Sequence, residues 1–314
     1  MDLGVQIEPQ LGFTFDDIVA IANDARAAGF TRLWVSDHLF NDADAVTTDC
    51  LEAWSLLAAL AVKTEGIRIG AMVTCQSYRN PALLAKIAAD VDVMSGGRLE
   101  FGVGAGWKEI EYLAYGYPFP DGPTRVTQLI ETLEICTRMW RERRATFHGK
   151  HYRIDDALCS PKPTQKPLPI WIGGSKPRVM RAAARFAHAF NFNLGTSART
   201  DRLKAAMREL DNICQAIKRD PPTLLRSSFL MSTVGTTAAR SEALLAEFAE
   251  QQKTDPAKIL EQRPGLLRET PERALSKLRE YAALGIAHAN IMFQPYGSER
   301  EQIAALAGIT AKLA

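Results

Sequence analysis

Short apolar runs alternate with amphipathic helical patterns along the chain, and this alternation restricts the fold more than any other feature. Eight such strand-then-helix units can be counted. Near-continuous apolar strands between helices predict a parallel sheet covered on both faces, and eight units suit a closed barrel better than an open sheet. The sequence therefore predicts an α/β fold, a (β/α)8 TIM barrel, with strands at 3–7, 32–37, 67–73, 98–105, 169–174, 189–194, 224–235 and 288–295.

The segments that follow these strands carry the helical period. Asn80 and Pro81 place a capping residue and then proline at the start of one helix, and Gly29 ends another. The expected helices lie at 16–30, at 51–64, from Pro81 onward, at 124–143, from Pro177 onward, at 198–219, in the region up to about 284 with a capped segment at 270–285, and near 299–313.

Residues 146–169 depart from this alternation. Their alternating apolar residues and clustered prolines predict a strand-like excursion followed by a stiff loop. We therefore expect an insertion at about 146–168, before the fifth strand. The 314 residues then form a single domain, since α/β barrels commonly reach this length.

Composition and charge exclude several classes of function. A net charge of +2 gives no field that would select nucleic acid or an anionic membrane. No apolar stretch is long enough to span a bilayer, and the first residues do not read as a signal peptide. The five scattered cysteines form no CxxC pair, so we expect a cytoplasmic protein with neither a disulfide framework nor a zinc cluster. No histidine pair has the HExxH spacing, so no metal site is expected.

The second strand ends in Asp37 and His38, and barrel active sites lie where strands end. Imidazole titrates near neutrality, so His38 is a candidate proton donor or acceptor. A histidine held only by structural hydrogen bonds is the alternative, which we expect for His188 and His288 at strand starts. Glu109 is a candidate second acid–base group, although an exposed loop glutamate is often only solvated.

Glycines mark two further strand ends. Gly104 and Gly106 would let a ligand approach the backbone closely, or would simply permit bends in a tight barrel strand. They do not form a dinucleotide fingerprint, because Trp107 stands where the third glycine is needed and no helix is expected directly after it. Residues 173–175, Gly-Gly-Ser, precede a helix start, which predicts an anion site suited to phosphate, with Lys176 and Arg178 nearby.

Several of these segments together resemble a known family. They are Ser-Asp-His at 36–38, the run at 80–120, Arg125 and the stretch at 151–174. They resemble the luciferase-like monooxygenase superfamily, and most closely its branch of probable F420-dependent oxidoreductases of actinobacterial type. The resemblance is strong over residues 1–195 and weaker over the C-terminal third. SGGRLEFGVGAGW followed by EY and PFP is its most specific part.

The resemblance implies a bacterial luciferase-like barrel with an insertion before strand 5, usually a homodimer. The coenzyme would lie across the carboxyl ends of the strands, with its phosphate at Gly173 and Gly174 and a non-proline cis peptide at Met72–Val73 behind its ring. His38 would face the substrate as the acid–base residue, and Glu109 would support it. The candidate coenzyme-binding residues are Asp37, Met72, Val73, Thr74, Gly104, Ala105, Gly106, Trp107, Gly173, Gly174, Ser175 and Asn193.

The function that the resemblance implies is hydride transfer between C5 of the deazaflavin coenzyme F420 and a small organic substrate, with His38 moving the proton. Two alternatives remain open on the same fold: an FMN-dependent monooxygenase, and a barrel that binds a coenzyme without turnover. The substrate cannot be identified from the sequence. The acidic loop at 40–50 disfavours a highly anionic one.

Overall fold

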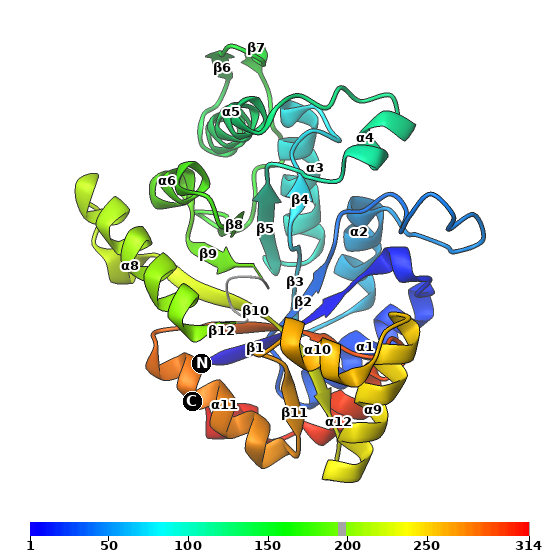
Figure 1. The fold of residues 1–314 in the computed structure, drawn as a ribbon. Coiled ribbons are helices and arrows are strands. Elements are labelled where there is room, and N and C mark those ends of the chain that lie inside the picture. The colour runs from blue at the N-terminus through cyan, green and yellow to red at the C-terminus, as the bar shows by residue number, and fades with distance from the viewer. Residues whose placement is uncertain (194–198, 314) are drawn as a thin grey trace.

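The computed structural model describes residues 1–193 and 199–313. Parallel pairing runs from β10 through β12, β1, β2, β3, β5, β8 and β9 and returns to β10, so the eight strands close into a barrel (Figure 1). The predicted (β/α)8 barrel is confirmed. Its strands are β1 (Asp2–Ile7), β2 (Arg32–Val35), β3 (Arg68–Ala71), β5 (Leu99–Gly104), β8 (Ile170–Gly174), β9 (Ala189–Phe192), β10 (Leu225–Val234) and β12 (His288–Phe293).

Helices surround the barrel in the order that the sequence predicts. Asn80 caps the third of them through backbone amides of Ala82 and Leu83, as its position before Pro81 suggests. The helices are α1 (Phe15–Ala27), α2 (Ala53–Lys63), α3 (Pro81–Met94), α4 (Glu109–Ala114), α5 (Gly122–Arg141), α6 (Pro177–Phe186), α8 (Thr200–Ala216), α9 (Ala238–Gln251), α10 (Pro256–Gln262), α11 (Pro271–Ala283) and α12 (Glu299–Ala305). No helix among the described residues is long and apolar enough to cross a membrane.

The short elements that the sequence did not lead us to expect include the helix α4 and the strands β4 (Thr74–Cys75) and β11 (Leu267–Glu269), which pair with β5 and β10 respectively. The short helix α10 lies within the region expected to be helical. The strand expected at 67–73 is shorter, because β3 ends at Ala71 and the chain pairs again only at Thr74. The predicted strand end at 194 and helix start at 198 lie outside the described residues.

The predicted excursion before the fifth barrel strand is an antiparallel hairpin of β6 (Ala145–His148) and β7 (Arg153–Ala157), which projects from the barrel (Figure 1). Glu131 of α5 holds its turn. Its carboxylate accepts hydrogen bonds from the amides of Lys150 at 2.7 Å and of His151 and Tyr152 at 2.9 Å each. Three amides on one buried carboxylate anchor the hairpin to the barrel's helical layer.

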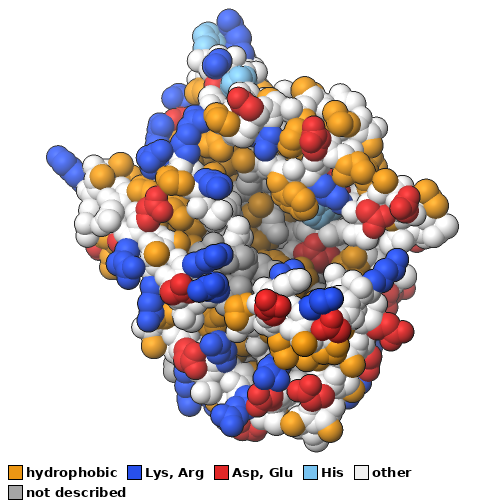
Figure 2. All heavy atoms as spheres, viewed as in Figure 1, with side chains coloured by type: hydrophobic (Ala, Val, Ile, Leu, Met, Phe, Trp, Pro, Cys, Tyr) orange, Lys and Arg blue, Asp and Glu red, His pale blue; other side chains and the backbone are white. Residues whose placement is uncertain are grey.

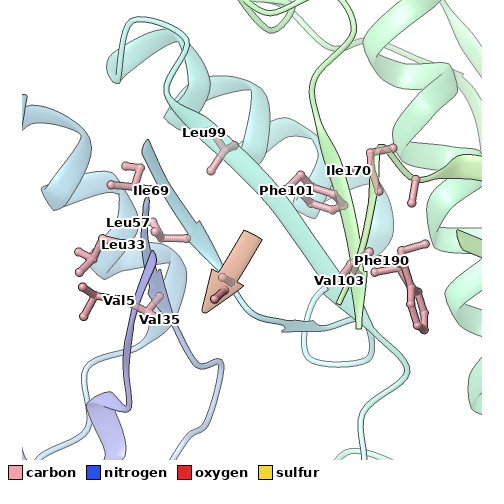
Figure 3. Packing of buried hydrophobic residues seen from close by; sticks show 14 of the residues in the cluster. Val5, Leu33, Val35, Leu57, Ile69, Leu99, Phe101, Val103, Ile170 and Phe190 are labelled. Carbon is pink, nitrogen blue, oxygen red and sulfur yellow. The ribbon is translucent and has the colours of Figure 1, made fainter. Parts of the chain in front are cut away.

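The main core lies between the barrel and its helices. Alternate strand residues point outward and are fully buried against them. Figure 3 shows this layer over one part of the barrel, with Leu57 of α2 beside Leu33 and Ile69. The labelled strand residues of the cluster come from six strands: Val5, Leu33, Val35, Ile69, Leu99, Phe101, Val103, Ile170 and Phe190.

Inside the barrel, Trp34 and Trp171 meet edge to face at 4.8 Å. Trp34 donates its indole N–H to Nε2 of His288 at 3.2 Å, so Nδ1 of that ring donates to Asp2 at 2.8 Å. Burial lowers the pKa of His288. Its position at the strand start and its bonded ring agree with the structural role expected for it.

Glu299, the first residue of α12, makes the free energy of unfolding depend on pH. Burial raises its pKa from 4.5 to about 7, although the amide of Gly297 donates to it at 2.9 Å. As the pH rises, the Glu299 carboxyl loses its proton in the unfolded chain at a lower pH than in the folded protein. The free energy of unfolding therefore falls between pH 4.5 and pH 7. We expect Glu299→Gln to raise that free energy by about 2 kcal/mol at pH 8 and to leave it unchanged below pH 4.

Urea denaturation at several pH values measures this difference. Glu301→Gln on the same helix is the matched control, because Glu301 is exposed and paired with Arg240; we expect it to change stability by less than about 1 kcal/mol. A Glu299→Gln protein with the same pH profile as the parent protein would show that the buried carboxyl does not control this dependence.

Candidate active site

A cavity of about 610 Å³ opens at the carboxyl ends of β2, β3, β5, β8 and β9. Figure 2 shows this face of the molecule hollowed near its centre. Of the fourteen candidate site residues, all but Glu109 line the cavity. The sequence predictions did not name seven further lining residues as site residues: Ser36, Cys75, Tyr78, Lys108, Glu111, Lys176 and Val179.

His38 stands at the edge of the cavity, just beyond β2. Its Nδ1 lies 3.0 Å from Oε2 of Glu111 and 3.2 Å from Oε1. The indole of Trp107 meets its ring edge to face at 5.8 Å. A carboxylate can only accept, so Nδ1 donates to Glu111 and Nε2 is left to exchange a proton with a ligand.

Glu111 is fully buried and accepts several hydrogen bonds. The amide of Leu39 donates to it at 2.8 Å, the hydroxyl of Tyr78 at 2.8 Å and Nζ of Lys108 at 3.3 Å. Burial alone would raise the pKa of Glu111, but the hydrogen bond to His38, the charge of that imidazole and the donors at Leu39 and Tyr78 lower it to about 2. The carboxylate therefore stays ionised and can stabilise a positive imidazole.

Glu109 does not take the role expected for it. It is exposed in the first turn of α4 and does not border the cavity. Two residues of helix correspond to a rotation of about 200°, so Glu109 and Glu111 face opposite sides. Because α4 begins at Glu109, Glu111 and not Glu109 turns toward His38.

Asp37 holds the loop that follows β3. Its Oδ2 accepts from the amide of Cys75 at 2.9 Å, and Arg79 binds both of its oxygens at 2.7 and 2.9 Å. Arg79 also contacts Glu52 at the start of α2. With its side chain fully buried, Asp37 fixes the cavity wall formed by this loop.

The glycines of β5 and β8 make room for the end of β3. The predicted cis peptide is present at Met72–Val73. A Cβ on Gly102 would lie 1.9 Å from the backbone oxygen of Ala71, and one on Gly104 would lie 2.6 Å from Cγ2 of Val73. A Cβ on Gly173 would lie 3.2 Å from Cγ1 of the same valine. These glycines are therefore needed because neighbouring strands pack closely. This agrees in part with the second interpretation of the glycines, in which they permit a tight barrel strand.

The start of α6 has the properties of an anion site. Gly174, Ser175 and Lys176 line the cavity there, and no side chain of the described residues caps the helix. Pro177 has no N–H, and the amides of Val179 and Met180 donate to the backbone oxygen of Lys176 at 2.9 and 3.0 Å. The anion site therefore rests on the positive end of the helix dipole and on the charge of Lys176. Arg178 does not add to this site, because it donates to Pro123 at 2.6 Å and to Thr127 at 2.8 Å on α5.

Two cysteines lie at the site, and neither is a nucleophile at neutral pH. Cys50 donates to the backbone oxygen of His38 at 3.3 Å, and Cys75 lies 3.0 Å from the hydroxyl of Tyr112. Burial raises the pKa of each thiol to about 11. Both thiols therefore stay protonated, which leaves His38 as the titratable group suited to proton transfer.

Comparison with known proteins places the chain in a family. The model of the luciferase-like monooxygenase family matches residues 2–308. An F420-dependent glucose-6-phosphate dehydrogenase of Microbacterium testaceum is 27% identical over 305 residues, 90% of this chain and 88% of that protein. An F420-dependent hydroxymycolic acid dehydrogenase of Mycobacterium tuberculosis is 30% identical over 234 residues, 74% of this chain and 62% of that protein.

Solved structures agree in fold at low sequence identity. An F420-dependent secondary alcohol dehydrogenase in complex with an F420–acetone adduct superposes with a TM-score of 0.80 at 18% identity, covering 97% of each chain. The EDTA monooxygenase of Chelativorans sp. BNC1 has a TM-score of 0.80 at 17% identity, covering 99% of this chain and 93% of that one. Since the family model matches nearly the whole sequence and the barrel is the same, the protein belongs to the luciferase-like monooxygenase family.

Proposed function

We propose that the protein is an F420-dependent oxidoreductase that transfers a hydride between the deazaflavin and a small organic substrate. One observation carries the proposal: His38, held by a buried carboxylate, shares a cavity with a helix start suited to phosphate. The names of the relatives from Microbacterium and Mycobacterium support F420 as the coenzyme.

The residues present fit such a coenzyme. Gly174, Ser175 and Lys176 before α6 would hold its phosphate, because they combine a cation with the positive end of a helix that no side chain of the described residues caps. Val73 and Met72 would back its ring from the end of β3, where the glycines of β5 and β8 leave space. When bound, the deazaflavin supplies the hydride chemistry at C5.

The protein's own contribution is a positioned proton relay. Glu111 accepts the Nδ1 proton of His38 and fixes the ring, so Nε2 can take the proton of a substrate hydroxyl or return it to a carbonyl oxygen. The ionised Glu111 stabilises the imidazolium that results. Asp37 acts indirectly, because Arg79 and Cys75 engage its oxygens and it holds the coenzyme-facing loop in place.

FMN remains the alternative coenzyme, because its phosphate would use the same helix start. We also propose that residues 1–314 form one domain with an insertion at about 146–168. The protein would act as a homodimer in the cytoplasm. The dimer follows from the family that the sequence resembles. The cytoplasm is consistent with five cysteines that are all free thiols.

The phosphate subsite can be tested on its own. We expect Lys176→Met to weaken F420 binding about tenfold, since it removes a cation from a partly exposed anion site. Arg178→Met is the matched control in the same helical turn and should leave the affinity within about twofold, because Arg178 is bound to α5. Tryptophan quenching by F420 measures both. Equal losses in the two variants would show only a general effect of charge.

A further inference from the structure

We propose that the substrate of this site is an uncharged alcohol or carbonyl compound with an apolar body, and not a phosphorylated sugar. The inference rests on the proposed function and concerns the part of the cavity beside His38. The relatives named as glucose-6-phosphate dehydrogenases raise the question, because a sugar phosphate carries a double negative charge that a pocket must neutralise.

The first argument is that Lys108 is already fully engaged. Its ammonium donates to the backbone oxygens of Phe40 at 2.6 Å and Asn41 at 2.5 Å and to Glu111 at 3.3 Å. An ammonium has three donors, so none is left for a ligand. Lys108 therefore ties the loop after β2 to the start of α4 and does not serve as a receptor for an anion.

The second argument concerns the other cation. As far as the structure describes the lining of the cavity, Lys176 is its one remaining lysine or arginine, and it lies at the helix start where the coenzyme phosphate would bind. Segment 194–198, whose sequence is Leu-Gly-Thr-Ser-Ala, contains no lysine or arginine. A phosphate on the substrate would have to compete for Lys176 with the coenzyme.

The charges around His38 are also unfavourable for an anion. Asp37, Glu52 and Glu111 contribute three carboxylates, whereas Arg79 and Lys108 contribute two cations that are paired with them. The neighbouring loop adds Asp42, Asp44 and Asp49. A dianion would therefore enter a negative field, and like charges at close range weaken binding strongly.

What the site offers instead is an apolar surface. Trp107 is 71% exposed although its indole lies beside His38, and it lines the cavity. Ile110 and Leu113 of α4 are also exposed, but they do not line the cavity, so Trp107 supplies the apolar surface beside His38. A large exposed aromatic side chain that lines a cavity is typical of a surface that an apolar ligand covers.

The reaction balances with these partners. In the oxidative direction the carbinol C–H of the substrate gives two electrons and a hydrogen as hydride to C5 of the deazaflavin, while the hydroxyl proton passes to Nε2 of His38. The products are a carbonyl compound, the reduced coenzyme and a protonated imidazole. The reverse direction returns the hydride to carbon and the proton to oxygen.

The test compares a matched pair of probes, 1-phenylethanol and its phosphate monoester, on F420-loaded protein. Binding of F420 is established first, so failure at that step counts against the proposed function and not against this inference. Deazaflavin fluorescence then reports probe binding, and we expect the alcohol to bind at least tenfold more tightly than the ester. An ester that binds equally well or better would overturn the inference, and so would failure of the alcohol to bind.

Lys108→Met examines the engaged lysine directly. We expect the ratio of the two affinities to change by less than about twofold, because the ammonium does not contact the substrate. The more negative field of the variant can weaken ester binding slightly, so only a selective loss of about tenfold or more, as expected for a direct contact, would overturn this. If the variant does not fold, ionic strength takes its place: added salt should strengthen ester binding by screening repulsion, and weaker binding would contradict the inference.

Discussion

Replacing His38 with alanine is expected to lower kcat by about 10²–10⁴-fold, the usual contribution of a positioned acid–base group. The affinity for F420 should stay within about twofold, because the phosphate and ring subsites lie on other strands. The loss follows from the geometry: Nε2 is the ring nitrogen that Glu111 leaves free to exchange a proton. Steady-state turnover and an F420 titration of the same preparation measure both quantities.

The matched control is His148→Ala. His148 also pairs with a carboxylate, Asp155 at 2.6 Å, but it lies exposed on the β6–β7 hairpin. We expect its removal to leave kcat unchanged. If His38→Ala turned over at close to the parent rate, His38 would have only a structural role and the proton relay would have to be sought elsewhere.

Gly102→Ala is expected to lower the free energy of unfolding by about 3 kcal/mol, at the upper end of the usual cost of overpacking a core. The added Cβ would lie 1.9 Å from the backbone oxygen of Ala71. A backbone atom of a neighbouring barrel strand cannot rotate away as a side chain can, so β3 and β5 must separate. Urea denaturation followed by tryptophan fluorescence measures the loss.

Gly122→Ala is the control for this substitution. Gly122 is the first residue of α5 and lacks a positive φ, and a Cβ added to it would meet no atom of the described residues within 4 Å. We expect this variant to change the free energy of unfolding by less than about 1 kcal/mol, because the loss of freedom in the unfolded chain and the restriction that Pro123 places on the residue before it act in opposite directions. A Gly102→Ala protein of parental stability would contradict the close approach of β3 and β5.

The barrel and most of the site could be predicted because both follow from periodicity. Once eight strand-then-helix units close into a barrel, all strand ends meet at one face. Asp37, Gly104 and Gly174 are far apart in the sequence, yet they could be assigned to one cavity before any of their contacts was known.

The partner of His38 could not be predicted in the same way. Glu109 and Glu111 are two residues apart, and only the start of the six-residue α4 decides which of them faces inward. So short a helix has too little periodicity to be recognised. The donors to Glu111 come from separate loops, at Leu39, Tyr78 and Lys108, and their convergence is a tertiary effect.

The reason for the glycines was also only partly foreseen. The sequence allowed two interpretations of Gly104, as room for a ligand or as a bend in a tight strand. In the structure a Cβ on Gly104 would meet Val73, and one on Gly102 would meet Ala71 of β3. Their effect on the cavity is therefore indirect, since they let Val73 reach its wall. A glycine in the sequence indicates that a Cβ does not fit at that position, whereas the structure is needed to identify the atoms that it would meet.

The central claim is that this cavity binds F420 for hydride transfer, and a paired titration of the purified protein tests it most directly. Intrinsic tryptophan fluorescence is followed while F420 and, separately, FMN are added. The account predicts saturable quenching by F420 with an affinity at least tenfold above that for FMN. A preference for FMN would contradict it and indicate an oxygen-using monooxygenase, and binding of neither coenzyme would leave a barrel without the proposed redox function.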